Sequence, residues 1–330
     1  MTHTDSSPTG KVNSFFRTRA WVQSWLDTWG KDPRIELIDI GGRDDPLEKM
    51  YLINHKIKDI LPVRSLVLAG CGFADFYPPR AEYNNIDLLI QLAGGVKPLM
   101  RDLCKLQWNQ LGLTDFCEHD SNQIIDQISQ PLYIVRTNCD LAYRIEPTDI
   151  ESYKAQLSAS TRTKYFNRRQ KLSNYGSLEF YDFDKPGEFF SILNEFHIRR
   201  WGRPCYSPQT ENFLRLFIDR FREEGGQVVM QAMQINGEIV SVLFDLVWEN
   251  FRYNLQSGYD EGRFGQLALG SLHLGFAIET ALKNNQGYDF LAGNGKQTNY
   301  KQKIATKAVP MDSFCLARGW LKHLYKLYGK

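Results

Sequence analysis

The chain has 330 residues, of which 42% are hydrophobic and 13% aromatic, a composition typical of a folded protein with enough sequence for two domains. Its formal net charge is only +2, so composition gives no electrostatic case for a nucleic-acid partner or an anionic membrane surface. The 6 cysteines show neither paired spacing nor histidines at metal-binding spacing, which argues against a disulfide framework and against a metal site.

The N-terminal residues and the length of the apolar runs indicate where in the cell the protein is expected. The opening residues MTHTDSSPTGK lack the apolar segment of a secretory signal. Every apolar run is shorter than the roughly 18 residues that a membrane span requires. We therefore expect a cytoplasmic protein without a membrane span, and the sequence leaves its oligomeric state open.

Residues 1–12 are predicted to form a disordered tail, and a mixed α/β unit is predicted over residues 13–147. Its first helix starts near Ser14 and ends at Gly30, with a tryptophan stripe at helical spacing that indicates core packing. Strands and helices then alternate. The predicted strands are 34–40, 50–54, 64–69, 111–117 and 132–138, and the predicted helices are 99–104 and 122–129.

A long loop over residues 70–85 carries aromatic and charged side chains, which is typical of functional or covering loops. Asp75, Tyr77, Arg80 and Glu82 are candidates for binding an acceptor substrate in a cleft between the two halves. The alternative is that they pack on the surface.

Residues 148–330 begin with a basic helical segment containing Arg162, Arg168 and Arg169. Such a run is ordinarily a solvated helix face, but it also suits a phosphate-bearing or otherwise anionic ligand. Arg162 is the leading candidate, because a guanidinium can bind phosphate through two parallel hydrogen bonds.

A strand at 178–182 and helices at 187–200 and 210–224 come next. His197 lies on the first helix, one turn before Trp201, on the face that its apolar residues define. It is either a hydrogen-bonded core residue or a catalytic group.

A meander of three strands is predicted at 227–233, 238–248 and 251–257, with turns at Asn236-Gly237 and Glu249-Asn250. Asp245 lies inside the apolar middle strand, where a carboxylate is costly unless it is paired. Either an arginine pairs with Asp245, or Asp245 is a general base.

Gly258, Gly262 and Gly265 precede an amphipathic helix predicted from Leu267 to Leu282. A glycine-rich turn before a helix start suits a phosphate, although a tight turn without ligand has the same composition. A short strand at 288–291 and a loop with Tyr300 and Lys301 follow.

Together these motifs resemble the GNAT acyltransferase superfamily, in particular its CelD-type branch of cellulose biosynthesis, and are distantly similar to the Fem-type transferases. The resemblance covers roughly residues 150–305. One difference is that this chain has Phe264 where the family often has proline before the turn glycine. The matching residues are Thr161, Arg162, Arg168, Arg169, His197, Arg200, Trp201, Gly265, Asp289, Phe290, Gly293, Tyr300 and Lys301.

The resemblance implies an α/β (α+β) fold of two tandem GNAT-like mixed sheets flanked by helices. Residues 13–147 would be a degenerate copy and residues 148–330 the acyltransferase domain. The implied enzyme moves an acetyl or longer acyl group from an acyl-CoA co-substrate to a small-molecule amine acceptor, and the resemblance links it to envelope or polysaccharide synthesis. An aminoacyl-tRNA-dependent Fem-type transferase and a non-catalytic binding protein are the alternatives.

The resemblance also implies roles for single residues. The catalytic candidates are Tyr300 as the acid toward the leaving thiolate, and Asp245 or His197 as the base, with Asp260 ranked behind them. The cofactor-binding candidates are Gly262, Arg263, Gly265, Gln266, Leu267, Arg162 and Lys301. The substrate-binding candidates are Asp75, Tyr77, Arg80, Glu82 and Trp201.

Overall fold

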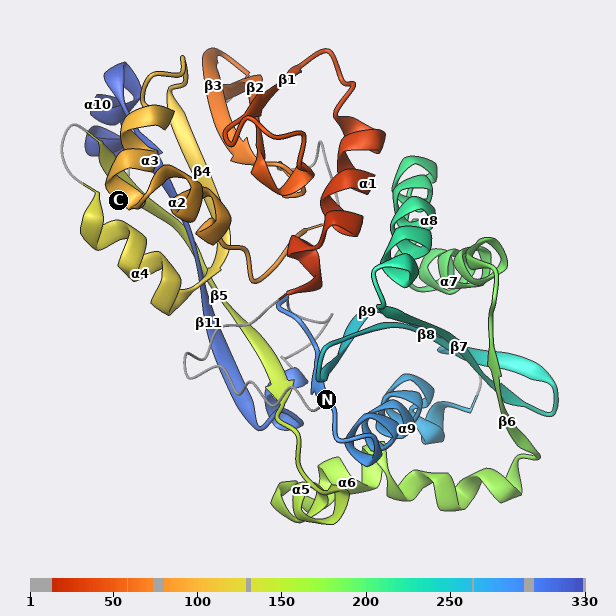
Figure 1. The fold of residues 1–330 in the computed structure, drawn as a ribbon. Helices are drawn as coiled ribbons and strands as arrows, with labels where there is room; N and C mark the ends of the chain where they lie inside the picture. The colour runs from red at the N-terminus through yellow and green to blue at the C-terminus, as the bar shows by residue number, and fades with distance from the viewer. Residues whose placement is uncertain are drawn as a thin grey trace, which may run out of the picture. The chain divides into compact units, whose positions relative to one another are not determined.

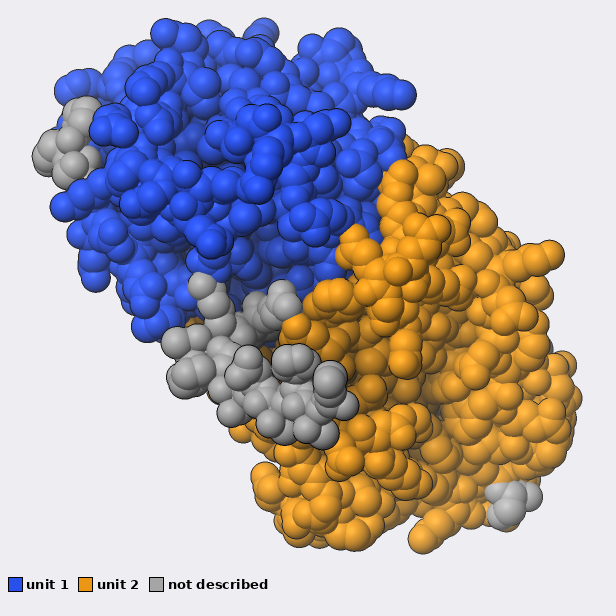
Figure 2. Space-filling view, in the orientation of Figure 1, with its two compact units in different colours: residues 1–139, 311–330 blue, residues 140–310 orange. Residues whose placement is uncertain are grey.

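The computed structural model describes residues 14–57, 59–73, 80–128, 132–262, 264–293 and 300–328. The chain divides into two compact units, shown in blue and orange in Figure 2. Unit 1 comprises residues 1–139 and 311–330, and unit 2 comprises residues 140–310. Two strands, β5 (Tyr133–Ile145) and β11 (Lys307–Ala317), carry the chain from one unit into the other.

Unit 1 opens with η1 (Phe15–Arg17) and α1 (Arg19–Trp29), each begun by a side-chain cap. Trp21, Trp25 and Trp29 of α1 are all buried, so the predicted packing role of the tryptophan stripe is confirmed. The ring of Trp25 stacks on that of Tyr51, with centroids 4.8 Å apart. These aromatic side chains hold α1 against the sheet of unit 1.

The sheet of unit 1 has the strand order β1-β2-β3-β4-β11. The first three strands form an antiparallel meander, β4 is parallel to β3, and β11 is antiparallel to β4. The elements of this unit, besides those already named, are β1 (Ile35–Asp39), η2 (Pro46–Glu48), β2 (Lys49–Ile57), β3 (Leu61–Leu68), α2 (Asp87–Ala93), α3 (Val96–Leu103), β4 (Gln110–Cys117), α4 (Glu118–Gln127) and α10 (Gly319–Tyr328).

The end of the chain was expected to belong to the second domain, residues 148–330, and no strand was predicted there. In the structure, β11 pairs with β4, for example Met311 with Cys117, and so residues 311–330 are grouped with unit 1. The partner strand lies far away in the sequence, and no local pattern reveals such a pairing.

Unit 2 has the strand order β5-β10-β9-β8-β7-β6. Strands β6 to β9 are antiparallel, whereas β10 is parallel to β9 and antiparallel to β5. Its elements are α5 (Ile150–Gln156), α6 (Ala159–Tyr165), η3 (Asn167–Asn174), β6 (Leu178–Asp182), α7 (Pro186–Trp201), α8 (Pro208–Glu223), β7 (Gln227–Ile235), β8 (Glu238–Trp248), β9 (Phe251–Tyr259), η4 (Gly265–Leu267), α9 (Leu269–Lys283), β10 (Gly287–Asp289) and η5 (Lys301–Lys303).

The meander of unit 2 follows its predicted turns. Asn236 and Gly237 both have positive φ angles, 52° and 77°, as a two-residue hairpin turn requires. Glu249 also has a positive φ, 50°, at the turn from β8 to β9. The strands predicted from these turns are confirmed.

Helices cover both faces of the unit 2 sheet: α7 and α8 lie on one face and α9 on the other (Figure 1). Helix α9 approaches its neighbours closely through two glycines. A Cβ atom on Gly275 would overlap the carbonyl oxygen of Tyr165, and one on Gly270 would press into the ring of Tyr259. These contacts fix α9 against α6 and β9, next to the site described below.

Both units thus contain an antiparallel meander, a helical connection and a parallel strand, the fold expected from the resemblance. No helix in the described part of the chain is long and apolar enough to cross a membrane. Among the same residues, no group of three His, Cys, Asp or Glu side chains is placed to hold a metal ion.

Candidate active site

Strands β9 and β10 run parallel over only three residue pairs, from Gly287 with Phe251 to Asp289 with Tyr253. Strand β9 continues to Tyr259, and β8 accompanies it to that end. Beyond Tyr253, therefore, the edge of β9 that faces away from β8 has no strand partner among the described residues. An open sheet edge offers backbone N–H and C=O groups to an extended ligand.

A β-bulge lies at the point where β10 stops. Asp245 pairs with Asn254, but the next residue back on β8, Phe244, pairs with Gln256. Leu255 is consequently an extra residue in β9. A bulge of this kind bends its strand and redirects the side chains beyond it.

The turn from β9 to α9 is held by polar contacts and by left-handed backbone. The carboxylate of Asp260 accepts a hydrogen bond from the Gly262 N–H at 2.9 Å. Phe264 and Ala268 have positive φ angles of 51° and 52°. Helix α9 begins at Leu269 without a side-chain cap, so its first backbone N–H groups face the turn with the positive end of the helix dipole.

The predicted cofactor residues of this turn take different positions. Leu267 was predicted to begin the helix, but it lies in η4, is fully buried, and its N–H donates to the carbonyl of Phe264. Gln266 is exposed beside it. Arg263 lies outside the described residues, and Gly262 and Gly265 belong to the turn itself.

The two predicted phosphate-binding cations both contact backbone carbonyls. Arg162 Nη1 donates to the Leu157 carbonyl at 2.6 Å, at the end of α5. Lys301 Nζ donates to the carbonyls of Leu291 and Ala292 at 2.9 and 2.6 Å. In this conformation both side chains anchor ends of secondary structure, and their contact with a donor stays a prediction.

Tyr300 packs against the core cluster that contains Tyr165, Ile278 and Tyr288. Burial raises the pKa of the Tyr300 phenol to about 12, with a further rise from Tyr259 that the positive charge of Arg200 partly offsets. The phenol therefore keeps its proton at neutral pH and is able to donate it.

His197 lies on α7 with its Nε2 3.3 Å from the Ser257 carbonyl oxygen, on the part of β9 that extends past β10. Burial, assisted by the charge of Arg200, lowers the pKa of His197 below its ordinary value. The ring is therefore neutral at pH 7. If Nε2 carries the proton donated to Ser257, Nδ1 holds the lone pair that a base requires.

Arg200 connects these two groups, because its charge acts on the pKa of both His197 and Tyr300. Its guanidinium lies 4.8 Å from the ring centroid of Tyr259, and its Nε lies 2.9 Å from a carboxylate oxygen of Glu261. The structure thus places the neutral imidazole of His197 at the open edge of β9, and the charge of Arg200 acts on both this imidazole and the protonated phenol of Tyr300.

Asp245 is fully buried and saturated with hydrogen bonds. Arg252 Nε and the Tyr288 hydroxyl donate to its Oδ2 at 2.5 and 2.9 Å, and Asn254 Nδ2 donates to its Oδ1 at 2.7 Å. A carboxylate held in this way is poorly suited to accept a substrate proton. The geometry favours the ion-pair alternative for Asp245 over the role of general base.

The described residues among the substrate candidates belong to two units. Arg80 donates to both carboxylate oxygens of Asp115, at 2.7 and 2.5 Å, and the neighbouring Glu82 is buried in unit 1. Trp201 belongs to unit 2, at the exposed end of α7. Asp75 and Tyr77 lie outside the described residues.

Several residues around the site were missed from the sequence. Counting along both strands from the two-residue turn at Glu249-Asn250 pairs Asn254 with Asp245. This hydrogen-bond partner of Asp245 could therefore have been predicted from the sequence. Tyr165 and Tyr259 give no such signal, because they come from distant segments that only the fold brings to Tyr300.

Comparisons with known proteins bear on the family of this domain and on the fold. Residues 159–302 match a family model described as an acetyltransferase (GNAT) domain. No curated protein matches the chain.

Among solved structures, FemX is similar over 93% of this chain and 93% of its own, with a TM-score of 0.57 and 11% identity. A conserved protein of unknown function from Bacteroides thetaiotaomicron VPI-5482 matches over 92% of this chain and 90% of its own, with a TM-score of 0.51 and 13% identity. The C-terminal domain of a putative lysylphosphatidylglycerol synthetase from Agrobacterium fabrum gives a TM-score of 0.50 at 9% identity, over 94% and 91% of the two chains. At sequence identities this low, the three structural similarities are evidence for the fold alone.

Unit 2 therefore contains a GNAT acetyltransferase domain, and the protein is an enzyme of the acyltransferase type.

Proposed function

We propose that the protein transfers an acyl group from a CoA thioester to an amine, with the donor bound at the open edge of β9. The observation that carries this proposal is the short pairing of β9 with β10, which leaves the edge from Asn254 to Tyr259 free of a strand among the described residues. The two amides of a pantetheine arm are suited to hydrogen-bond with such an edge. The uncapped start of α9 offers a place for the pyrophosphate.

The transfer needs two proton movements and little covalent help, because a thioester is already activated. His197 removes a proton from the acceptor ammonium, and the amine nitrogen then forms a bond to the thioester carbonyl carbon. As the carbon–sulfur bond breaks, Tyr300 gives its proton to the leaving thiolate. The nitrogen loses its second proton to solvent as the amide forms, and Tyr300 regains a proton from solvent. Arg200 stabilises the transient tyrosinate, because it already interacts with this phenol.

The branch of the family, the location of the protein and the alternative donor are also part of this proposal. The CelD-type branch, and with it a role in polysaccharide or envelope synthesis, rests on the sequence motifs alone. An intracellular location follows from the use of a CoA thioester. The alternative donor is an aminoacyl group, which the similarity to FemX keeps open.

Calorimetric titration with acetyl-CoA, a long-chain acyl-CoA and free CoA tests the donor class. We expect micromolar binding, corresponding to about 8 kcal/mol. Gln266→Glu adds a negative charge to the turn before α9 and should weaken binding about tenfold through repulsion of the phosphates. Thr280→Glu makes the same charge change on an exposed position further along α9 and should have no effect. Absence of binding to all three ligands would contradict the proposal and favour the aminoacyl donor.

His197→Asn is expected to lower kcat by about 10²-fold, the lower end of what a positioned base contributes. Because burial lowers the pKa of His197, the wild-type rate should fall only when the pH drops below the ordinary histidine value of 6.5. This acid limb should be absent from the pH dependence of kcat in the variant. His323→Asn, on the exposed face of α10, is the matched control. If His197→Asn keeps both the wild-type kcat and its fall at low pH, His197 is not the general base.

A further inference from the structure

Two side chains already bind the backbone of Ser257, which lies on the open edge of β9. The Asp260 N–H donates to the Val240 carbonyl of β8 at 3.0 Å. Bonded and non-bonded positions alternate along an antiparallel pair, so Ser257, three residues before Asp260, turns its N–H and C=O away from β8. The Ser257 N–H donates to Gln256 Oε1 at 3.0 Å, and the Ser257 carbonyl is the one that His197 contacts.

The two backbone groups of Ser257 differ in how many partners they can take. A carbonyl oxygen has two lone pairs, so the Ser257 carbonyl can accept from a ligand amide and keep its contact with His197. The N–H carries one hydrogen, and Gln256 already accepts it. An amide carbonyl of a donor arm that binds this edge therefore competes with Gln256 for the Ser257 N–H.

The Gln256 side chain is half-buried and has other polar partners nearby. Burial lowers the pKa of His197, and hydrogen bonds to Ser257 and Gln256 act in the opposite direction. Gln256 also hydrogen-bonds to the thiol of Cys205, whose pKa burial raises to about 12. The amide of Gln256 therefore keeps polar neighbours when it releases Ser257, and the cost of a buried unpaired group does not arise.

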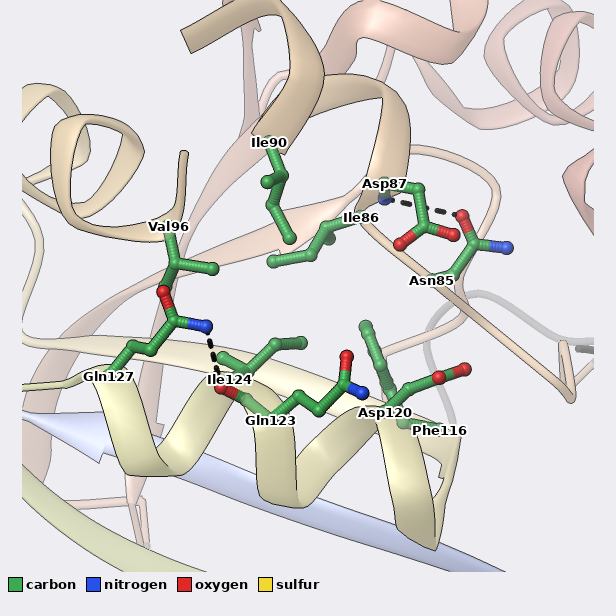
Figure 3. Close-up of a pocket in the computed structure, with 10 residues that line it drawn as sticks. All are labelled: Asn85, Ile86, Asp87, Ile90, Val96, Phe116, Asp120, Gln123, Ile124 and Gln127. Atoms are coloured by element: carbon green, nitrogen blue, oxygen red, sulfur yellow. Dashed lines mark hydrogen bonds between the residues drawn. The ribbon is translucent and has the colours of Figure 1, made fainter. Parts of the chain in front are cut away.

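The edge of β4 in unit 1 is closed differently, by buried main chain. Asn84 is buried, forms a parallel bridge to Phe116, and donates its N–H to the Asp115 carbonyl at 2.9 Å. Figure 3 shows the cavity of about 160 Å³ that remains beside this edge, with Ile86 and Ile124 among its lining. A cavity of about 150 Å³ holds a molecule the size of benzene, which is much smaller than a pantetheine arm. Main chain closes this edge permanently, whereas a side chain can leave an edge by changing its rotamer.

We propose that Gln256 regulates access to the donor edge of β9. In the donor-free protein its side-chain oxygen holds the Ser257 N–H, and an amide carbonyl of the donor arm displaces it. The Ser257 N–H is then paired in both states, so this part of the open edge is not offered to a strand of another chain. Gln256 acts in this way only if the donor binds at the edge proposed above. The competing explanation is that Gln256 is a fixed cap of the β-bulge and the donor does not contact the Ser257 N–H.

Titration of the wild type and of Gln256→Met with CoA and with pantetheine separates the two explanations. Methionine has a similar length but lacks the amide oxygen, so the ligand no longer displaces a hydrogen bond. We expect both ligands to bind about three- to tenfold more tightly to Gln256→Met, whereas loss of a fixed cap would leave binding equal or weaker. Pantetheine carries the two amides without the phosphates and so assigns the gain to the arm. Gln227→Met, at an exposed glutamine where β7 begins, is the matched control and should bind as the wild type does.

Hydrogen exchange of the Ser257 amide, measured without ligand, should be faster in Gln256→Met than in the wild type. Unchanged exchange, or wild-type binding of CoA with equal or weaker binding by the variant, would overturn the role of Gln256 and leave the proposed donor standing. Absence of CoA binding by both proteins would refute the donor class, and the role of Gln256 with it. Thermal melting checks that the variant is folded. Gln256→Leu removes the same oxygen and repeats the test if the methionine variant is not folded.

Discussion

Asp245→Ala is expected to destabilise the protein by about 3 to 5 kcal/mol, the usual cost of removing one partner from a buried ion pair. The guanidinium of Arg252 would remain buried without the carboxylate to which its Nε is bonded at 2.5 Å. Asn254 and Tyr288 would lose their acceptor at the same time. Urea unfolding followed by tryptophan fluorescence measures the change in midpoint.

The matched control is Asp182→Ala, which removes an exposed carboxylate from the edge strand β6 where it accepts a hydrogen bond from Gln231. Its cost should stay below about 1 kcal/mol. The double variant Asp245→Leu with Arg252→Met removes both charges and should be less damaging than Asp245→Ala alone. If Asp245→Ala unfolds like the wild type and instead abolishes turnover, the base role would replace the structural one.

The sequence predicted most of unit 2 because its signals are local. The Asn236-Gly237 turn, the alternating β9 strand and the glycine-rich start of α9 each determine their own structure, and the strands they predict are present.

Contacts between distant parts of the chain explain why other features of unit 1 could not be predicted from the sequence. Helix α2 was not predicted. Arg80 and Glu82 were candidates for binding an acceptor, but in the structure Arg80 donates to Asp115 and also pairs with Glu82. Asp115 in turn accepts a hydrogen bond from Ser313 on β11. The loop, β4 and the end of the chain are thus joined by contacts that span some 200 residues, and no spacing rule anticipates them.

Both units contain a pair of parallel strands, β9 with β10 and β3 with β4, but the edge beside the pair differs between them. In unit 2 the β9 edge past Tyr253 is open among the described residues, and His197 and Tyr300 lie near it. In unit 1 Asn84 occupies the corresponding edge of β4. We therefore expect one donor per chain in the titration, and a stoichiometry of two would contradict the closure of unit 1.

Tyr300→Phe is expected to lower kcat by about 10²- to 10⁴-fold, the range for a positioned acid, while the donor dissociation constant changes less than about twofold. Phenylalanine keeps the ring in the core cluster with Tyr165 and Ile278, so the fold and the donor site should persist. Only the proton for the leaving thiolate is lost. Single-turnover kinetics together with calorimetry separate the two quantities.

The pH dependence and the leaving group sharpen this test. Because burial raises the pKa of Tyr300 to about 12, the phenol stays protonated through the accessible alkaline range, and the wild-type rate should not fall through loss of this proton below about pH 10. An S-phenyl thioester expels a more acidic thiol that needs less protonation, so the defect of Tyr300→Phe should shrink with that donor. Tyr181→Phe, an exposed tyrosine on β6, is the matched control. Equal defects with both donors would show that Tyr300 positions the loop and does not supply the proton.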